Sequence, residues 1–121
     1  MLDRKALERR CGGDDKLVAR VLDKFSARLD ETVEALAAAC RDADFNEIIS
    51  RAHALGGSAG NTGALALAAL AIAMESDARA RDLPASRQVL AQLRVAARDW
   101  HQELSAAPAD LSLSTSVNAG V

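Results

Sequence analysis

Apolar residues recur every three to four positions along most of the chain, which is the spacing of one face of an α-helix. The longest stripe starts just after Asp14 and stops near Arg41 and Asp42. Asp is a favoured N-cap residue, so we predict one long helix over this stretch. Its apolar face would consist of Leu17, Val18, Val21, Leu22, Phe25, Leu29, Val33, Leu36 and Cys40.

Shorter stripes predict four more helices, over about 3–10, 44–60, 64–80 and 85–105. Asp3 and Asp44 stand where N-caps are expected, and Glu47 follows Asp44 at the spacing of a capping box. Pro84 stands where a helix begins. The residues expected in the core of the last three helices are Ile48, Ala52, Leu55, Ala59, Leu67, Leu70, Ala71, Met74, Val89, Leu93, Ala96, Trp100 and Leu104.

Four longer helices with short connections, each with one apolar stripe, are typical of an antiparallel up-down four-helix bundle. The short first helix would close one end of it. From Ala106 onward the composition changes to Ala, Pro, Ser, Thr, Asn and Gly. We therefore predict an all-α domain over 1–105 and a flexible C-terminal tail over 106–121.

Composition narrows the classes of function. A length of 121 residues suits one domain, and a formal charge of -2 gives no strong attraction to nucleic acid or anionic lipid. No apolar run approaches the roughly 20 residues of a membrane span, and the N-terminus lacks the apolar stretch of a signal peptide. We expect a cytoplasmic protein with no membrane insertion, in which Cys11 and Cys40 are free thiols.

The helix predicted over 44–60 carries one unusual feature, at His53. With about 100° between successive residues, the core positions of this helix lie on the side opposite His53, so the imidazole points outward. The positions on its own face, at −4, +3, +4 and +7, are Ile49, Gly56, Gly57 and Gly60.

Glycine inside a helix costs about 1 kcal/mol relative to alanine, and this chain uses alanine freely elsewhere. One interpretation is that the glycines leave open space around the His53 ring. A large partner could then bring its own active site to the imidazole. A neutral imidazole is nucleophilic near neutral pH and can accept and donate a phosphoryl group. The alternative is a plain surface histidine, with glycines that only loosen the last turn or permit close helix packing.

The stretch 51–64, which reads RAHALGGSAGNTGA, resembles the signature of histidine phosphotransfer (HPt) domains, approximately A-H-x-L-K-G-S-[SA]-x-x-x-G-A. The matching residues are Ala52, His53, Leu55, Gly57, Ser58, Ala59, Gly63 and Ala64. Leu67 and the Met74-Glu75 pair fit the downstream pattern, and the helix layout agrees from 2 to 105.

This resemblance implies that His53 accepts a phosphoryl group and exchanges it with an aspartate on a receiver domain. Gly57 would give the ring and the incoming phosphate room, with Gly56 and Gly60 also supporting, and Ser58 would lie near the opposite side and support helix packing. The Mg²⁺ for the transfer would belong to the receiver, so no cofactor or metal is expected on this chain.

The sequence departs from the family pattern at one position. The family usually has a lysine three residues after the histidine, and here that residue is Gly56. The absence of the lysine should weaken the attraction for phosphate by about 1 kcal/mol at a solvated site. A basic ridge on the second helix includes Arg28, and two interpretations stay open: Arg28 supplies a cation to the site, or it belongs only to a solvated face. For Ile49 the two interpretations are a place in a receiver-docking patch and packing against the neighbouring second helix.

These observations lead to a phosphocarrier in a two-component phosphorelay, not an enzyme, because the active site belongs to the partner. The expected partner is a response-regulator receiver domain or a hybrid sensor kinase, and we expect a monomer. The alternative function is a degenerate HPt-like binding module that docks a receiver without phosphotransfer. His101 lacks flanking glycines and is interpreted as a surface residue, and the His and Cys positions form no metal-ligand cluster.

Overall fold

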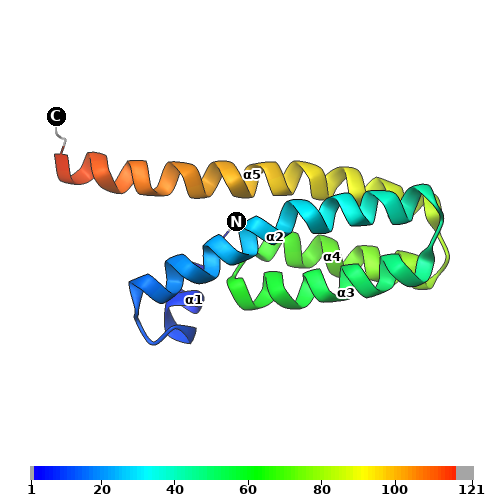
Figure 1. Cartoon of the computed structure of the whole chain (residues 1–121), viewed down its shortest axis with the longest axis horizontal. Coiled ribbons are helices and arrows are strands. Elements are labelled where there is room, and N and C mark those ends of the chain that lie inside the picture. The colour runs from blue at the N-terminus through cyan, green and yellow to red at the C-terminus, as the bar shows by residue number, and fades with distance from the viewer. Residues whose placement is uncertain (1, 117–121) are drawn as a thin grey trace.

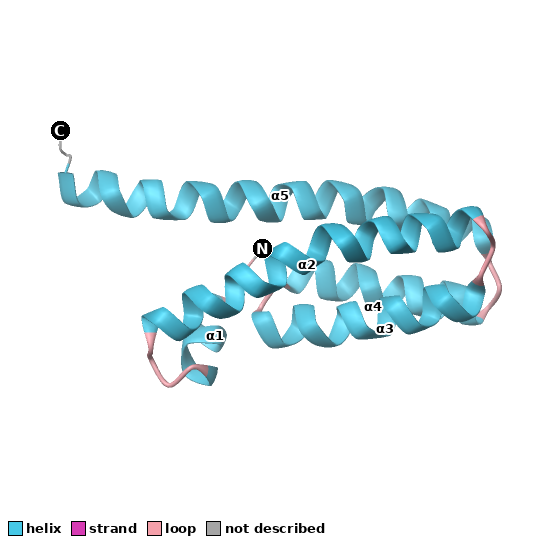
Figure 2. Ribbon diagram, in the orientation of Figure 1, coloured by secondary structure: helices cyan, strands magenta, loops and turns pink. Residues whose placement is uncertain are grey.

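The computed structural model describes the backbone of residues 2–116 and the side chains of residues 2–105, and its regular elements are helices (Figures 1 and 2). Their bounds are α1 Arg4–Arg10, α2 Asp15–Arg41, α3 Phe45–Thr62, α4 Leu65–Arg79 and α5 Leu83–Ser116. Each of the four longer helices packs against the next in the chain, and α2 also packs against α5, which closes the ring. The predicted four-helix bundle with a short N-terminal helix is confirmed.

The N-caps form as the sequence predicted. Asp3 accepts a hydrogen bond from the Ala6 amide at 3.1 Å, and Asp44 accepts one from the Glu47 amide at 3.1 Å. The predicted capping box is only half made. The Asp44 amide donates to the Ala39 carbonyl at 2.9 Å, and the Glu47 carboxylate accepts from Arg51 Nε at 2.7 Å, an ion pair one turn along the same helix.

The apolar stripes meet in one core. Where α2 faces α5, the rings of Phe25 and Trp100 pack edge to face with centroids 5.3 Å apart. The Trp100 indole N–H donates to Ser26 Oγ at 2.9 Å, so this buried side chain leaves no unpaired donor. Leu17 is an exception to the predicted stripe. It is 37% exposed because it lies in the first turn of α2, at the periphery of the bundle.

Helix α5 departs from the sequence prediction at its C-terminal end. We expected it to end near 105, where the composition becomes polar, but the helix continues to Ser116 and extends beyond the end of α2 in Figure 1. The segment 106–116 still contains alanine and leucine, which have high helix propensity. The predicted end at 105 is therefore wrong, residues 117–121 lie outside the described residues, and the flexibility of the tail stays a prediction.

The connection between α3 and α4 is held by the N-terminal segment. Helix α3 ends at Thr62, two residues beyond the predicted end, and Gly63 caps it in the left-handed conformation with φ of 85°. Its carbonyl accepts from the Asp3 amide at 2.7 Å, and Leu2 forms an isolated antiparallel bridge with Ala64. A Cβ on Gly63 would lie 2.7 Å from the Asp3 carbonyl oxygen, so only glycine fits this approach.

Candidate functional site

His53 lies on the outer face of α3, with 77% of its side chain exposed. The opposite side of the same helix carries Ile48, Ala52 and Leu55, which are buried in the bundle core. The outward orientation that the helical spacing predicted is therefore confirmed. The ring is anchored on a helix, which gives it a defined position, yet a large partner can reach it.

A carboxylate from the neighbouring helix fixes one nitrogen of this ring. Glu75, on α4, places Oε1 3.1 Å from His53 Nδ1. A carboxylate can only accept a hydrogen bond, so Nδ1 is the nitrogen that carries the proton. In the neutral imidazole this leaves the lone pair on Nε2, which selects one nitrogen as the nucleophile.

Glu75 is itself held by Arg79, one turn further along α4. Arg79 donates to Glu75 Oε2 from Nε at 3.2 Å and from a terminal nitrogen at 2.8 Å. These bonds, and then the bond from His53, lower the pKa of the Glu75 carboxyl below its ordinary value. Glu75 is therefore an ionised acceptor at neutral pH, as the bond to Nδ1 requires.

Sequence reasoning missed this role of Glu75, although the residue belonged to the motif match. The signal was available in the topology. Counting antiparallel residues away from the Gly63 turn places His53 level with about residue 74, because α3 and α4 rise equally per residue. Applied to this helix pair, the count would have singled out Glu75 as the polar residue nearest that level.

The glycines around His53 differ in their surroundings. A Cβ built on Gly57 or Gly60 would have no described atom within 4 Å, whereas one on Gly56 would contact Ala71 and Ile72 of α4 at 3.7 Å. Gly57 and Gly60 therefore leave open space beside the ring. Gly56 borders α4, so the expectation that all three glycines give clearance holds for two of them.

Comparison with known proteins bears on this exposed, carboxylate-held histidine. The family model of the Hpt domain matches residues 20–109. The chain belongs to the Hpt domain family. Hpt domains are phosphocarriers that work with receiver domains and kinases in phosphorelays, so membership supports a histidine phosphotransfer role.

A solved structure with the same fold as this Hpt domain is the crystal structure of histidine-containing phosphotransfer protein B (HptB) from Pseudomonas aeruginosa PAO1. It matches with a TM-score of 0.73 and 24% sequence identity, covering 84% of this chain and 92% of that chain. The search of curated proteins found no match.

A groove between α2 and α3 runs beside the histidine face of this Hpt domain. Arg28 and Lys24 of α2 line it together with Ala54 and Ser58 of α3. Ser58 is exposed there, and its hydroxyl donates to the Leu55 carbonyl at 3.3 Å. Arg28 therefore lines the same groove as Ala54, the residue that follows His53. A role for Arg28 in phosphotransfer stays a prediction.

The apolar residues near the site divide between packing and exposure. Ile49 is half-buried and packs against the hydrophobic core, and its part in receiver docking stays a prediction. Ile72 is 63% exposed on α4, beside Gly56. Sequence reasoning missed Ile72, because it lies outside the predicted core stripe of this helix and no motif singled it out.

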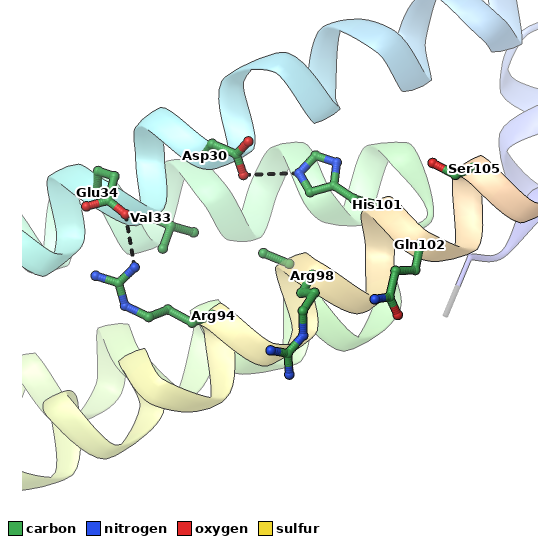
Figure 3. Close-up of a pocket in the computed structure, with 9 residues that line it drawn as sticks. Asp30, Val33, Glu34, Arg94, Arg98, His101, Gln102 and Ser105 are labelled. Atoms are coloured by element: carbon green, nitrogen blue, oxygen red, sulfur yellow. Dashed lines mark hydrogen bonds and ion pairs between the residues drawn. The ribbon is translucent and has the colours of Figure 1, made fainter.

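A second groove lies on another side of the Hpt domain, between α2 and α5 (Figure 3). Two polar contacts between side chains cross it. His101 Nε2 lies 3.0 Å from Asp30 Oδ1, and Arg94 donates to Glu34 at 2.9 Å. His101 is a partly exposed side chain, consistent with the surface position expected for it, and it serves as a cross-link between two helices.

The described part of the chain contains neither a metal-binding cluster nor a membrane-spanning helix. Among these residues, no cluster of three or more His, Cys, Asp or Glu side chains is arranged to hold a metal ion. Likewise, no helix searched combines the length and apolar character that crossing a bilayer requires. Cys11 and Cys40 are both buried and unpaired, which confirms the expectation of free thiols.

Proposed function

We propose that this Hpt domain carries a phosphoryl group on Nε2 of His53, accepting it from an aspartyl phosphate on one receiver domain and donating it to an aspartate on another. The observation that carries this proposal is a largely exposed imidazole whose Nδ1 is committed to Glu75 at 3.1 Å. A nucleophile of this kind needs orientation and access more than a pocket.

The transfer follows from the two ring nitrogens. The Nε2 lone pair attacks phosphorus, and the bond between phosphorus and the aspartyl oxygen breaks, returning its electrons to the aspartate carboxylate. The phosphorylated ring keeps the proton on Nδ1 and is cationic at that moment, so the Glu75 carboxylate stabilises it. Donation to a second aspartate reverses these bond changes and regenerates the neutral ring.

Open surroundings determine what the partner must contribute. Gly57 and Gly60 leave space beside His53, and the acidic residues and metal of phosphotransfer would enter with the receiver. In this proposal the Mg²⁺ belongs to the receiver, this chain binds no cofactor of its own, and a monomer is sufficient. The same arrangement accounts for a carrier that is inactive alone, rather than an enzyme.

The test uses receivers labelled on their aspartate with radioactive phosphate. Incubation with the wild-type domain should give acid-labile, base-stable label on this chain, and His53→Gln should stay unlabelled. NMR of the phosphorylated domain should place phosphorus on Nε2. A wild-type domain that binds receivers yet stays unlabelled across a panel of them would instead support the binding module, and label on Nδ1 would overturn the role given to Glu75.

A further inference from the structure

Resting on this proposed function, we propose that Arg79 is a positioning residue for phosphotransfer. In this proposal it holds Glu75 in the rotamer that accepts from His53 Nδ1, and it offsets the carboxylate charge as the phosphoryl group arrives. Its guanidinium does not need to touch the imidazole to do so.

The geometry forms a chain of three side chains across two helices. Arg79 donates twice to Glu75 Oε2, at 3.2 and 2.8 Å, while Glu75 Oε1 lies 3.1 Å from His53 Nδ1. Each carboxylate oxygen thus has its own partner. Rotation of the carboxylate about its last torsion would break both contacts, so the bond from Arg79 restricts the orientation in which Nδ1 is met.

Arg79 also acts through its charge, by reducing the repulsion between Glu75 and the incoming phosphoryl group. An incoming phosphoryl group is strongly anionic, and the carboxylate that orients His53 is anionic too, so the two repel at this distance. Gly56 supplies no cation on the face of the ring. Arg79 pairs with Glu75 and offsets part of its charge, which reduces this repulsion while Oε1 stays bonded to Nδ1.

The other charged groups around the site have different partners or positions. On α3, Arg51 pairs with Glu47 at 2.7 Å. From α2, Lys24 and Arg28 line the groove on the other side of α3. From α4, Glu75 and Arg79 face the ring. Of these cations, Arg79 is the one bonded to the carboxylate that holds the imidazole.

Loss of Arg79 should slow phosphorylation of His53. Without the two bonds from Arg79, the Glu75 carboxylate is no longer held in the orientation that accepts from Nδ1, and its charge is no longer offset as the phosphoryl group arrives. Phosphorylation should slow by about twofold, the size expected for one exposed ion pair.

The experiment compares four proteins, with phosphoramidate as a small phosphoryl donor and then with a phosphorylated receiver. Arg79→Gln should slow phosphorylation by about twofold, and Arg79→Lys, which keeps the charge, should restore the wild-type rate. Arg51→Gln is the matched control, because it removes an equally spaced Glu–Arg pair on α3 that has no bond to the ring. Circular dichroism and thermal unfolding verify that all four are folded.

The outcomes separate the two proposals. Absence of label on wild-type His53 from any receiver would overturn the proposed function. Label on His53 at the same rate for Arg79→Gln as for wild type would overturn the role of Arg79 alone. An equal slowing in Arg51→Gln would also overturn it, because the effect would then be a general one of surface charge.

Discussion

Replacing Gly57 with alanine tests two separate effects of this glycine: its effect on the stability of the fold and its effect on the access of a receiver to His53. Gly57 lies inside α3, and its new Cβ would meet no described atom within 4 Å. An interior helical glycine is about 1 kcal/mol less favourable than alanine, so Gly57→Ala should raise the free energy of unfolding by up to about that amount. For a domain of this size, the midpoint of thermal unfolding should rise by about 4 °C.

The same methyl group lies one helical turn from His53, on the face that a receiver must approach. Crowding at a packed contact costs about 1–3 kcal/mol, so transfer from a phosphorylated receiver should slow by about tenfold or more. Phosphoramidate is small, and its reaction with His53 should keep the wild-type rate. Urea and thermal unfolding measure the first effect, and labelling kinetics with the two donors measure the second.

A variant of opposite sign serves as the control. Gly63→Ala introduces a side chain at a φ of 85° and 2.7 Å from the Asp3 carbonyl oxygen, so it should destabilise the domain by about 1–3 kcal/mol. The clearance argument is wrong if Gly57→Ala stabilises the domain and leaves receiver transfer unchanged. The helix-propensity argument is wrong if Gly57→Ala fails to stabilise it.

Three further predictions address the surface, the core and the carboxylate. Ile72 is 63% exposed, so Ile72→Asp should change stability by less than about 0.5 kcal/mol yet reduce receiver transfer by about tenfold; an unchanged transfer rate would exclude Ile72 from the docking surface. Burial raises the pKa of the Cys40 thiol, partly countered by the Arg87 charge, so thiol reagents should modify Cys40 about 100-fold more slowly in the folded protein than in urea, and equal rates would contradict that burial. The bonds from Arg79 and His53 lower the pKa of the Glu75 carboxyl from 4.5 in the folded protein. The stability difference between wild type and Glu75→Gln should therefore be fully present above pH 4.5 and be lost as the pH falls through the folded-state pKa. Urea unfolding at pH 7 and pH 3 tests this, and a constant difference would mean that the carboxylate charge plays no part.

The helix positions and their caps could be predicted because they depend on local patterns. Asp3, Asp14 and Asp44 cap the helices that follow them, through bonds to amides two or three residues away. The outward direction of His53 follows from the spacing of residues within one helix. Each of these features requires only a few consecutive residues and the geometry of the α-helix.

The missed features depend on contacts between helices or on competition between local bonds. Glu75 meets His53 across 22 residues of sequence, and this contact depends on how α4 is rotated against α3. The capping box is incomplete because the Asp44 amide donates to the Ala39 carbonyl after α2, and Glu47 accepts from Arg51. The end of α5 was misjudged because polar composition indicates solvent exposure, whereas a backbone helix can continue without a packed face.

The attachment of α1 to the end of α3 has a consequence for the helix that carries His53. Arg10 donates to the Gly60 and Asn61 carbonyls at 3.0 and 2.7 Å, beside the bond that Gly60 accepts from the Gly63 amide at 3.3 Å. The glycine-rich last turn of α3 is thus held by a residue fifty positions earlier in the sequence. A substitution at the exposed Arg10 therefore acts on this helix although the two residues are far apart in the chain.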